Sequence, residues 1–276
     1  MMINKYNFLN WSNLFFDRNI GKNSKGLFSD FLKGSFNRKF NYYFKYYNIY
    51  YMKQLIKSSI HVSLIVQLIT GIISVFGIFQ SIPKKHKILT DILIIETIVQ
   101  SIEFVFYIWL IMSLGNNNIM THRRYIDWVI TTPIMLISTG MFFEYSKYIK
   151  ENKKEVLTFW DFLKDNSRII YKIVILNFLM LVFGFLGEIN MLPKYFSIPV
   201  GFIFFIWNFY IIYDEFGKNN EKTKKLFYIL FIVWASYGIT AMMNNQPKNL
   251  SYNILDIIAK NFYGFFLFYH KIKKKK

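Results

Sequence analysis

One lysine lies deep inside an apolar segment near the C-terminus. In Tyr252-Asn-Ile-Leu-Asp256-Ile-Ile-Ala-Lys260, an acid and a base stand four residues apart, which is one turn of a helix. A lysine at mid-depth in a membrane helix costs roughly 2.5–3.5 kcal/mol on insertion scales, so it needs a partner or a chemical role. A second acid, Asp127, lies with Arg124 in another apolar segment. A buried amine facing two buried carboxylates can carry a protonated Schiff base whose charge the carboxylates offset.

Two segments resemble those of the microbial rhodopsins. The run Arg124-Tyr-Ile-Asp-Trp-Val-Ile-Thr-Thr-Pro133 is similar to the third helix of bacteriorhodopsin and proteorhodopsin, and Tyr252-Asn253-x-x-Asp256-x-x-x-Lys260 is similar to their seventh. The matches occur in the right order, and the resemblance covers about residues 58–271. It implies an all-α, seven-transmembrane-helix bundle enclosing all-trans retinal, which Lys260 holds as a Schiff base.

The resemblance also implies roles for the other buried charges. Asp127 and Asp256 share the charge of the Schiff base on Lys260, and Asp127 accepts its proton. Asp127 stands three residues after Arg124 and four before Thr131, so these three lie along one helical stripe. Arg124 then holds the aspartates ionised and Thr131 hydrogen-bonds Asp127. The other interpretation is a structural Arg–Asp pair at a helix end, and the presence of Lys260 favours the counterion role.

Further matches to the family predict the walls of a retinal pocket. The residues at retinal-contacting positions are Trp128, Thr132, Met135, Met180, Gly184, Trp234 and Tyr237. Each aromatic residue alone is more often ordinary packing, and only the joint pattern favours a pocket. On the fifth helix, Phe202 and Phe205 remain alternatives. Met135 stands where marine relatives use an apolar residue for green and glutamine for blue absorption, so we predict green absorption.

Three residues depart from the pattern of the family. Gly238 follows Tyr237 where proline is usual, and Ala241 stands where a pocket tryptophan often occurs. Both predict a looser pocket at the end that receives the retinal ring. Ser138 lies on the Asp127 stripe, where proton pumps commonly carry Asp or Glu as the cytoplasmic proton donor. Serine cannot supply a proton near neutral pH, which counts against a pump.

The second helix carries a stripe of acids in an otherwise apolar segment. Glu96, Gln100 and Glu103 fall at i, i+4 and i+7, and the segment ends at Tyr107. Acids inside a membrane span usually mark a proton relay or an ion path, so these residues and Ser138 form the predicted ion path. Glu-x6-Glu-Phe-x-Phe looks like the second helix of channelrhodopsins, and the Lys-, Asn-, Ile- and Phe-rich composition is similar to that of giant-virus rhodopsins. The other interpretation makes Glu103 a neutral structural acid.

Three classes of function follow, and none is an enzyme. A light-gated cation channel is favoured by the acids of the second helix and by Ser138. An outward light-driven proton pump is the alternative, because Asp127, Thr131 and Arg124 form a pump-like core. A sensory photoreceptor is third, because no signalling domain is expected in this chain. The expected partners are the lipid bilayer and a proton or small cation, with a homo-oligomer left open.

Composition places the chain in a membrane. Of its 276 residues, 54% are hydrophobic and 21% aromatic, and several stretches exceed the roughly 18 apolar residues that mark a membrane span. The net charge of +18 lies mainly in loops and tails, which argues against nucleic acid as a partner. The chain has no cysteine, which excludes disulfides and cysteine-based metal sites, and no metal is expected.

Seven helices are predicted to position these residues. They span about 58–80, 88–114, 123–143, 167–188, 196–216, 225–243 and 250–271. Lysine and arginine concentrate in the loops after the first, third and fifth of them and in the tail 272–276. This asymmetry predicts a cytoplasmic C-terminus and an external N-terminus, in the plasma membrane or an internal membrane. A short surface helix is predicted around Trp160.

The two ends of the chain are basic. Residues 1–57 form an aromatic extension that is either an amphipathic helix at the membrane surface or a disordered segment. The helical interpretation rests on the four-residue spacing of Phe28, Leu32, Phe36, Phe40 and Phe44. The final residues, Lys273 to Lys276, either anchor the tail to anionic lipid or act as a dilysine retrieval signal.

Overall fold

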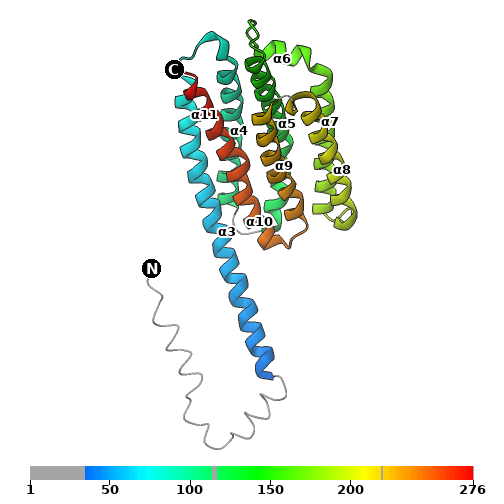
Figure 1. Ribbon diagram of the computed structural model, residues 1–276. Coiled ribbons are helices and arrows are strands. Elements are labelled where there is room, and N and C mark those ends of the chain that lie inside the picture. Colours follow the sequence, from blue (N-terminus) through cyan, green and yellow to red (C-terminus); the bar gives the residue numbers. More distant parts are fainter. Residues whose placement is uncertain (1–34, 114–116, 219, 276) are drawn as a thin grey trace, which may run out of the picture. The chain divides into compact units, whose positions relative to one another are not determined.

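The computed structural model describes residues 35–113, 117–218 and 220–275, in which every regular element is helical (Figure 1). The elements are α3 (Ser35–Ile78), η2 (Lys84–His86), α4 (Ile88–Met112), α5 (Asn117–Lys150), α6 (Phe159–Asp165), α7 (Ser167–Glu188), α8 (Lys194–Ile212), η3 (Tyr213–Gly217), α9 (Glu221–Ala241), α10 (Asn245–Asp256), η4 (Ile257–Asn261) and α11 (Phe262–Lys273). Successive α10, η4 and α11 form the seventh span. The predicted all-α, seven-helix bundle is confirmed.

Five helical stretches of the described chain are long and apolar enough to cross a membrane: Tyr50–Ile78, Lys84–Met112, Thr121–Lys150, Ser167–Glu188 and Lys194–Gly217. Helix α9 and the seventh span are not among them, and the seventh span carries the charged residues Lys248, Asp256 and Lys260. Apolar side chains such as Ile72, Val105 and Ile232 are more than half exposed on the outside of the bundle. Lipid tails solvate such a surface, whereas the helices satisfy their own backbone hydrogen bonds.

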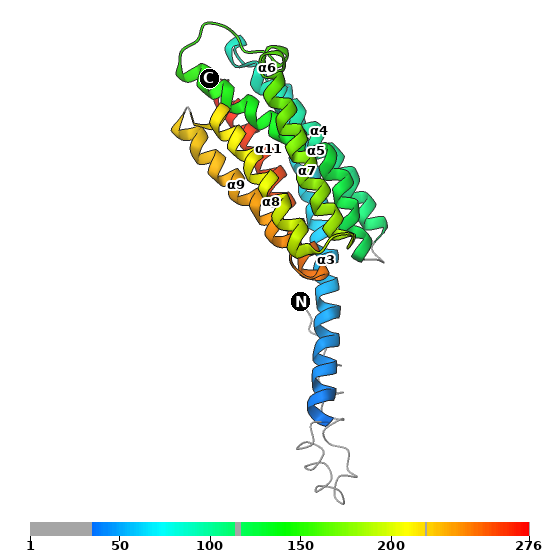
Figure 2. The same ribbon diagram turned by 90° about the vertical axis from the view of Figure 1, so that its right-hand side faces the viewer.

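The helices pack mainly with neighbours in the sequence. Helix α7 lies against α8, and α4 lies against α5, as both views show (Figures 1 and 2). The largest apolar core fills the half of the bundle that contains the C-terminus, where Leu93, Phe143, Phe227 and Leu267 are buried. A smaller apolar cluster that includes Ile56, Ile60 and Leu110 is buried toward the other end, and polar and charged side chains are buried between the two.

Three predicted boundaries differ from the structure. The first helix was expected to begin near residue 58, but α3 begins at Ser35 and continues without interruption, because residues 35–57 contain no glycine or proline. Residues 1–34 lie outside the described part, so the nature of the 1–57 extension stays a prediction. Helix α5 extends to Lys150, beyond the apolar span, and ends before Asn152, whose φ of 51° is left-handed.

The third difference concerns the seventh helix, which was expected to be continuous over 250–271. The π-helical turn η4 interrupts it at Ile257–Asn261, and this turn contains Lys260. Such turns are uncommon and occur frequently at functional sites. The predicted surface helix around Trp160 is confirmed as α6, which begins after Thr158, whose hydroxyl accepts a hydrogen bond from the amide of Asp161.

Candidate functional site

The Lys260 side chain is buried in the middle of the bundle beside two carboxylates. Its Nζ atom lies 2.6 Å from Oδ2 of Asp127 on α5 and 3.3 Å from Oε1 of Glu103 on α4. The side chain is only 3% exposed, so this ammonium is far from solvent. A charge at such depth is stable only with close opposite charges, and the structure provides two of them.

The second carboxylate beside Lys260 is therefore Glu103, where the sequence analysis expected Asp256. One turn of a helix separates Asp256 from Lys260, but no oxygen of the Asp256 carboxylate lies within 4 Å of Nζ of Lys260. Instead it forms an ion pair with Arg124, whose Nη1 lies 2.6 Å from Oδ2. The predicted charges lie together but pair differently from the expectation, because spacing on one helix does not determine which neighbouring helix a side chain faces.

Asp256 is fixed by donors from three helices. Its Oδ2 accepts hydrogen bonds from Arg124 and, at 2.8 Å, from the hydroxyl of Tyr107 on α4. Its Oδ1 accepts one at 2.9 Å from the hydroxyl of Tyr237 on α9. Arg124 also donates to the side-chain oxygen of Asn253. Tyr107, which was assigned to the ion path, thus lies in a closed network around Asp256.

Thr131 does not bond the Asp127 carboxylate as expected. Its hydroxyl donates to the backbone oxygen of Asp127 at 2.9 Å, which is the usual partner of a threonine in a helix. The Oδ1 atom of Asp127 is buried and has no hydrogen-bond partner in the described structure. Asp127 therefore depends on Lys260 for most of its stabilisation, because Arg124 is paired with Asp256.

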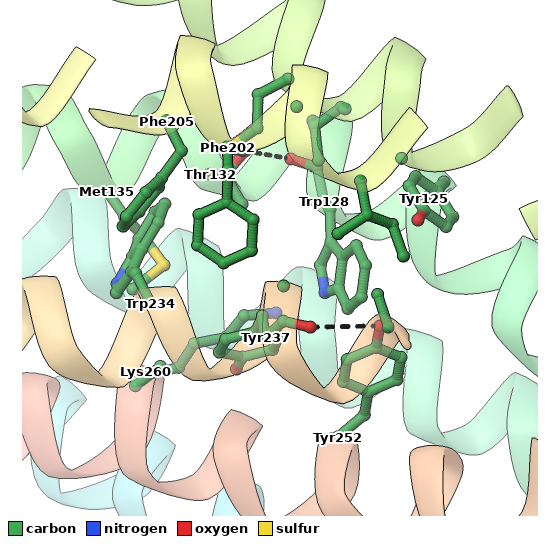
Figure 3. A pocket seen from close by; sticks show the side chains of 18 residues that line it. Tyr125, Trp128, Thr132, Met135, Phe202, Phe205, Trp234, Tyr237, Tyr252 and Lys260 are labelled. Atoms are coloured by element: carbon green, nitrogen blue, oxygen red, sulfur yellow. Dashed lines mark hydrogen bonds between the residues drawn. The ribbon is translucent and has the colours of Figure 1, made fainter. Parts of the chain in front are cut away.

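A cavity extends from Lys260 between α5, α7, α8 and α9 (Figure 3). All seven predicted pocket residues line it: Trp128, Thr132, Met135, Met180, Gly184, Trp234 and Tyr237. Both Phe202 and Phe205 line it too, so the two alternatives on the fifth helix are not exclusive. Sequence analysis missed Tyr125, Leu181, Ile198, Gly201, Tyr252 and Ala259, which also line it. Helical spacing on α5 and α8 was a signal for Tyr125 and Gly201.

The far part of the cavity contains the two residues that depart from the family pattern. Gly238 and Ala241 both line it. The ring of Phe202 occupies the space at Gly238 that a Cβ atom would need, so this position tolerates only glycine unless Phe202 moves. The expectation of a looser pocket is thus only partly met, because Phe202 fills the space that Gly238 leaves.

Ser138, at the position where proton pumps commonly carry an acid, contacts the acid Glu96. Its hydroxyl donates to Oε1 of Glu96 on α4 and, at 2.9 Å, to the backbone oxygen of Met135. Both Ser138 and Glu96 are completely buried, and Oε2 of Glu96 has no partner in the described structure. A buried carboxyl group therefore does lie at this level of the bundle, supplied by α4 instead of α5.

A row of polar side chains on α3 was missed by the sequence analysis. Ser59, Ser63, Gln67, Thr70 and Ser74 recur every three or four residues, the spacing of one helical face. They hydrogen-bond the seventh span and α4: Asn253 donates to Ser59 at 2.7 Å, Asn261 donates to Gln67 at 2.8 Å and to Thr70 at 2.7 Å, and Ser74 donates to Gln100 at 3.2 Å. We call these five residues, with Gln100, Glu103, Asn253 and Asn261, the polar seam.

Comparison with known proteins identifies the family. A sequence model of bacteriorhodopsin-like proteins matches residues 56–274, most of the chain. The chain is a microbial rhodopsin. The green-light absorbing proteorhodopsin of Gamma-proteobacterium EBAC31A08 is 20% identical to this rhodopsin over 168 residues. These residues are 55% of this chain and 61% of that protein, so the match spans less than two thirds of the relative.

Solved structures agree with the family assignment. The crystal structure of viral rhodopsin OLPVRII is 27% identical with a TM-score of 0.69, covering 79% of this chain and 98% of that one. Blue light-absorbing proteorhodopsin from Med12 is 20% identical with a TM-score of 0.60, covering 80% and 98%. The second match shows the fold alone. The rhodopsin is therefore a multi-pass membrane protein, and the chromophore of its family is retinal.

The cavity fits that chromophore. Its walls are apolar and aromatic, as a polyene and its ring require, and residues from five spans line it. The amine of Lys260 lies at one end of it, beside Asp127. Apart from Lys260, no lysine of the described chain lines this cavity, so this residue alone is placed to attach an aldehyde there.

Proposed function

We propose that this rhodopsin is a light-gated channel for small cations, with the polar seam as its ion path. The observation that supports the proposal is that the seam runs between α3, α4 and the seventh span and passes directly beside Lys260. Polar side chains buried along a whole helix face serve little purpose in a protein that only needs stable packing, because each costs free energy to bury.

Several atoms of the seam are buried without a hydrogen-bond partner in the described structure. They are Nε2 of Gln67, Nε2 of Gln100, both carboxylate oxygens of Glu103 and Oδ1 of Asn261. Clustered buried polar atoms of this kind are normally satisfied by ordered water. A row of them beside a light-sensitive centre therefore supports a hydrated path rather than a dry helix interface.

The charges around the seam favour cations over anions. Around Lys260, the three carboxyl groups of Glu103, Asp127 and Asp256 are buried with two basic groups, Lys260 and Arg124. In a region of low dielectric constant, an excess of carboxylates lowers the energy of a passing cation and raises that of an anion. Lysine and arginine gather at the end with the C-terminus, so we assign that end to the cytoplasm.

We propose that Lys260 holds retinal, and that the gate responds to the charge on its nitrogen. Bound retinal supplies visible absorption and a light-driven isomerisation that re-aims the N–H bond of this nitrogen. Asp127, 2.6 Å away, is placed to accept the proton. Once the nitrogen is neutral, Glu103 loses its counter-charge. A shift of the π turn η4 would then separate Asn261 from Gln67 and Thr70 and open the middle of the seam.

Light-evoked current in voltage-clamped cells tests the proposal. A channel current reverses sign at the equilibrium potential of the permeant cation and follows that potential when external sodium or potassium is changed. Gln67→Leu should reduce this current several-fold while leaving the visible band, because it makes the middle of the seam apolar. Ser101→Ala, on the exposed face of α4, is the matched control and should conduct normally. A current that keeps one sign under every gradient would refute the channel.

One observation favours an outward proton pump as the second candidate. The contact between Glu96 and Ser138 puts a buried carboxyl group on the cytoplasmic side of Lys260, where Ser138 alone could not supply a proton. A pump would acidify the outside of vesicles or cells in light without any ion gradient. In that case Glu96→Gln should slow the return of the ground-state absorption, whereas in a channel without net transport it should leave the decay little changed.

A further inference from the structure

Lys271 is a third buried lysine, besides Lys248 and Lys260, and it has no carboxylate partner within 4 Å in the described structure. It lies on α11 and is fully buried. Its Nζ atom donates hydrogen bonds to the backbone oxygens of Gly77 at 2.7 Å and Ile78 at 3.0 Å. These are the last two residues of α3, where helical hydrogen bonding of the carbonyl groups ends, and the Gly77 oxygen also accepts a hydrogen bond from the amide of Gln80 at 3.2 Å. An ammonium at this position satisfies the carbonyls and the negative end of the helix dipole.

Lys271 lies where the polar seam ends. The last polar level of the seam is the bond between Ser74 and Gln100, and Gln100 lies against the backbone of Gly264 on α11. Four residues beyond Ser74, α3 reaches Ile78, and seven residues beyond Gly264, α11 reaches Lys271. Both helices therefore extend from the seam toward the C-terminal end of the bundle (Figure 1). The ammonium of Lys271 joins them there.

Between the seam and Lys271 the contact between the helices is apolar and tight. A Cβ atom built on Gly77 would lie 2.5 Å from the Phe268 ring and 2.9 Å from Leu93. Leu267 is buried in the same cluster. Glycine at position 77 thus lets α3, α4 and α11 pack closely. The side chains of Leu93, Leu267 and Phe268 have no polar atom that could bind a passing ion. A hydrated ion cannot cross this belt unless α11 moves away from α3.

We propose that Lys271 is the latch that keeps the cytoplasmic end of the path closed, an inference that rests on the proposed channel function. Its ammonium ties α11 to the end of α3 and thereby holds the belt of Leu93, Leu267 and Phe268 shut. The same charge repels cations at the exit, because no carboxylate lies within 4 Å of it and Asp91 on α4 interacts with it only from farther away. Opening requires α11 to withdraw the ammonium from Gly77 and Ile78, and closing restores both bonds.

The distinguishing experiment compares Lys271→Met with Lys271→Arg in the full chain. Methionine keeps the apolar stem but has neither charge nor donors, whereas arginine keeps both. We expect Lys271→Met to slow closure after light is switched off by at least roughly tenfold, because it removes both charge-assisted hydrogen bonds. It should also raise the dark leak of potassium from vesicles, and Lys271→Arg should restore both properties. A role in helix capping alone would lower stability without changing either.

Lys275→Met is the matched control. Lys275 lies one turn farther along and donates to the side-chain oxygen of Gln80 at 2.9 Å, but it is exposed. The Lys275→Met variant should show the closing rate and the dark potassium leak of the wild type. Wild-type closing and wild-type dark leak in Lys271→Met with an intact visible band would overturn the latch. So would an equal change in Lys275→Met.

Two outcomes need a separate readout. If Lys271→Met shows no visible band, Lys271→Gln, which keeps donors without the charge, is measured in its place. If wild-type photocurrent never reverses, the proposed channel is wrong, but the dark potassium leak still tests the latch, because it requires no light-gated current. An unchanged dark leak in that case overturns the latch as well.

Discussion

The geometry around Lys260 predicts which carboxylate tunes the colour of the pigment. Removing an anion near the Schiff-base nitrogen moves absorption to longer wavelength, because the anion stabilises the positive charge more in the ground state than in the excited state, where the charge spreads along the polyene. We therefore expect Asp127→Asn to produce the largest red shift, Glu103→Gln a smaller one and Asp256→Asn the smallest.

Distances give the relative size of the first two effects. Nζ of Lys260 lies 2.6 Å from Asp127 and 3.3 Å from Glu103. With an effective dielectric constant of about 20, Coulomb's law gives about 6 kcal/mol for the shorter distance and about 5 kcal/mol for the longer one. The shift from Glu103→Gln should therefore approach four fifths of the shift from Asp127→Asn. Asp256 contributes less, because the charge of Arg124 at 2.6 Å largely cancels its field at Lys260.

Visible absorption spectra of the retinal-loaded protein at neutral pH provide the assay. Glu96→Gln is the control, because it removes an acid from the same face of α4 two turns away from Glu103. Its shift should be smaller than that of Glu103→Gln. A larger red shift for Asp256→Asn than for Glu103→Gln would show that the sequence-based pairing was right. A Glu103→Gln spectrum equal to wild type would show that Glu103 is protonated and is no counterion.

Three further predictions concern single residues. Lys260→Ala should abolish the visible band, whereas Lys248→Ala, which removes a buried lysine paired with Glu188 outside the cavity, should retain it. The wild type should absorb green light, and Met135→Gln should shift absorption to the blue; a blue-absorbing wild type contradicts this. Arg124→Gln should lower the free energy of unfolding by about 3–5 kcal/mol, because Asp256 remains as an unpaired buried charge. Adding Asp256→Asn to the same chain should restore much of the lost free energy, and denaturant titrations that follow the visible band measure both.

The fold could be predicted because its signals are local. Apolar length and basic loops define the spans, and the motif around Asp127 and that around Lys260 identify the third and seventh helices. The boundaries of α3 and α5 could not be predicted, since an apolar window ends where the membrane does, whereas a helix continues until a breaker such as Asn152. The π turn η4 could not be predicted either, because nothing in Ile257–Asn261 breaks helical spacing.

The sequence predicted which residues form the site better than it predicted which of them contact one another. The predicted pocket residues line one cavity because each was matched to a family position. The pairing of Glu103 with Lys260 depends on how α4 is rotated against the seventh span, which no single helix encodes. The polar row on α3 was detectable from its spacing. However, Ser and Thr inside a span also bond their own backbone, as Thr70 does with Val66, so the spacing alone does not show that the row contacts another helix.

The buried charges divide into a rigid group and a labile group, and this division determines what light can move. Asp256 accepts three hydrogen bonds from three helices, one of them from Arg124, so displacing it breaks several strong contacts at once. Asp127 and Glu103 have Lys260 as their close counter-charge, and their remaining oxygens are unbonded in the described structure. A change of charge on one nitrogen therefore releases Glu103 and the seam beside it while Arg124 and Asp256 keep the opposite side in place. In the proposed channel, the smallest rearrangement would therefore open the path toward α3 and α4, along the polar seam.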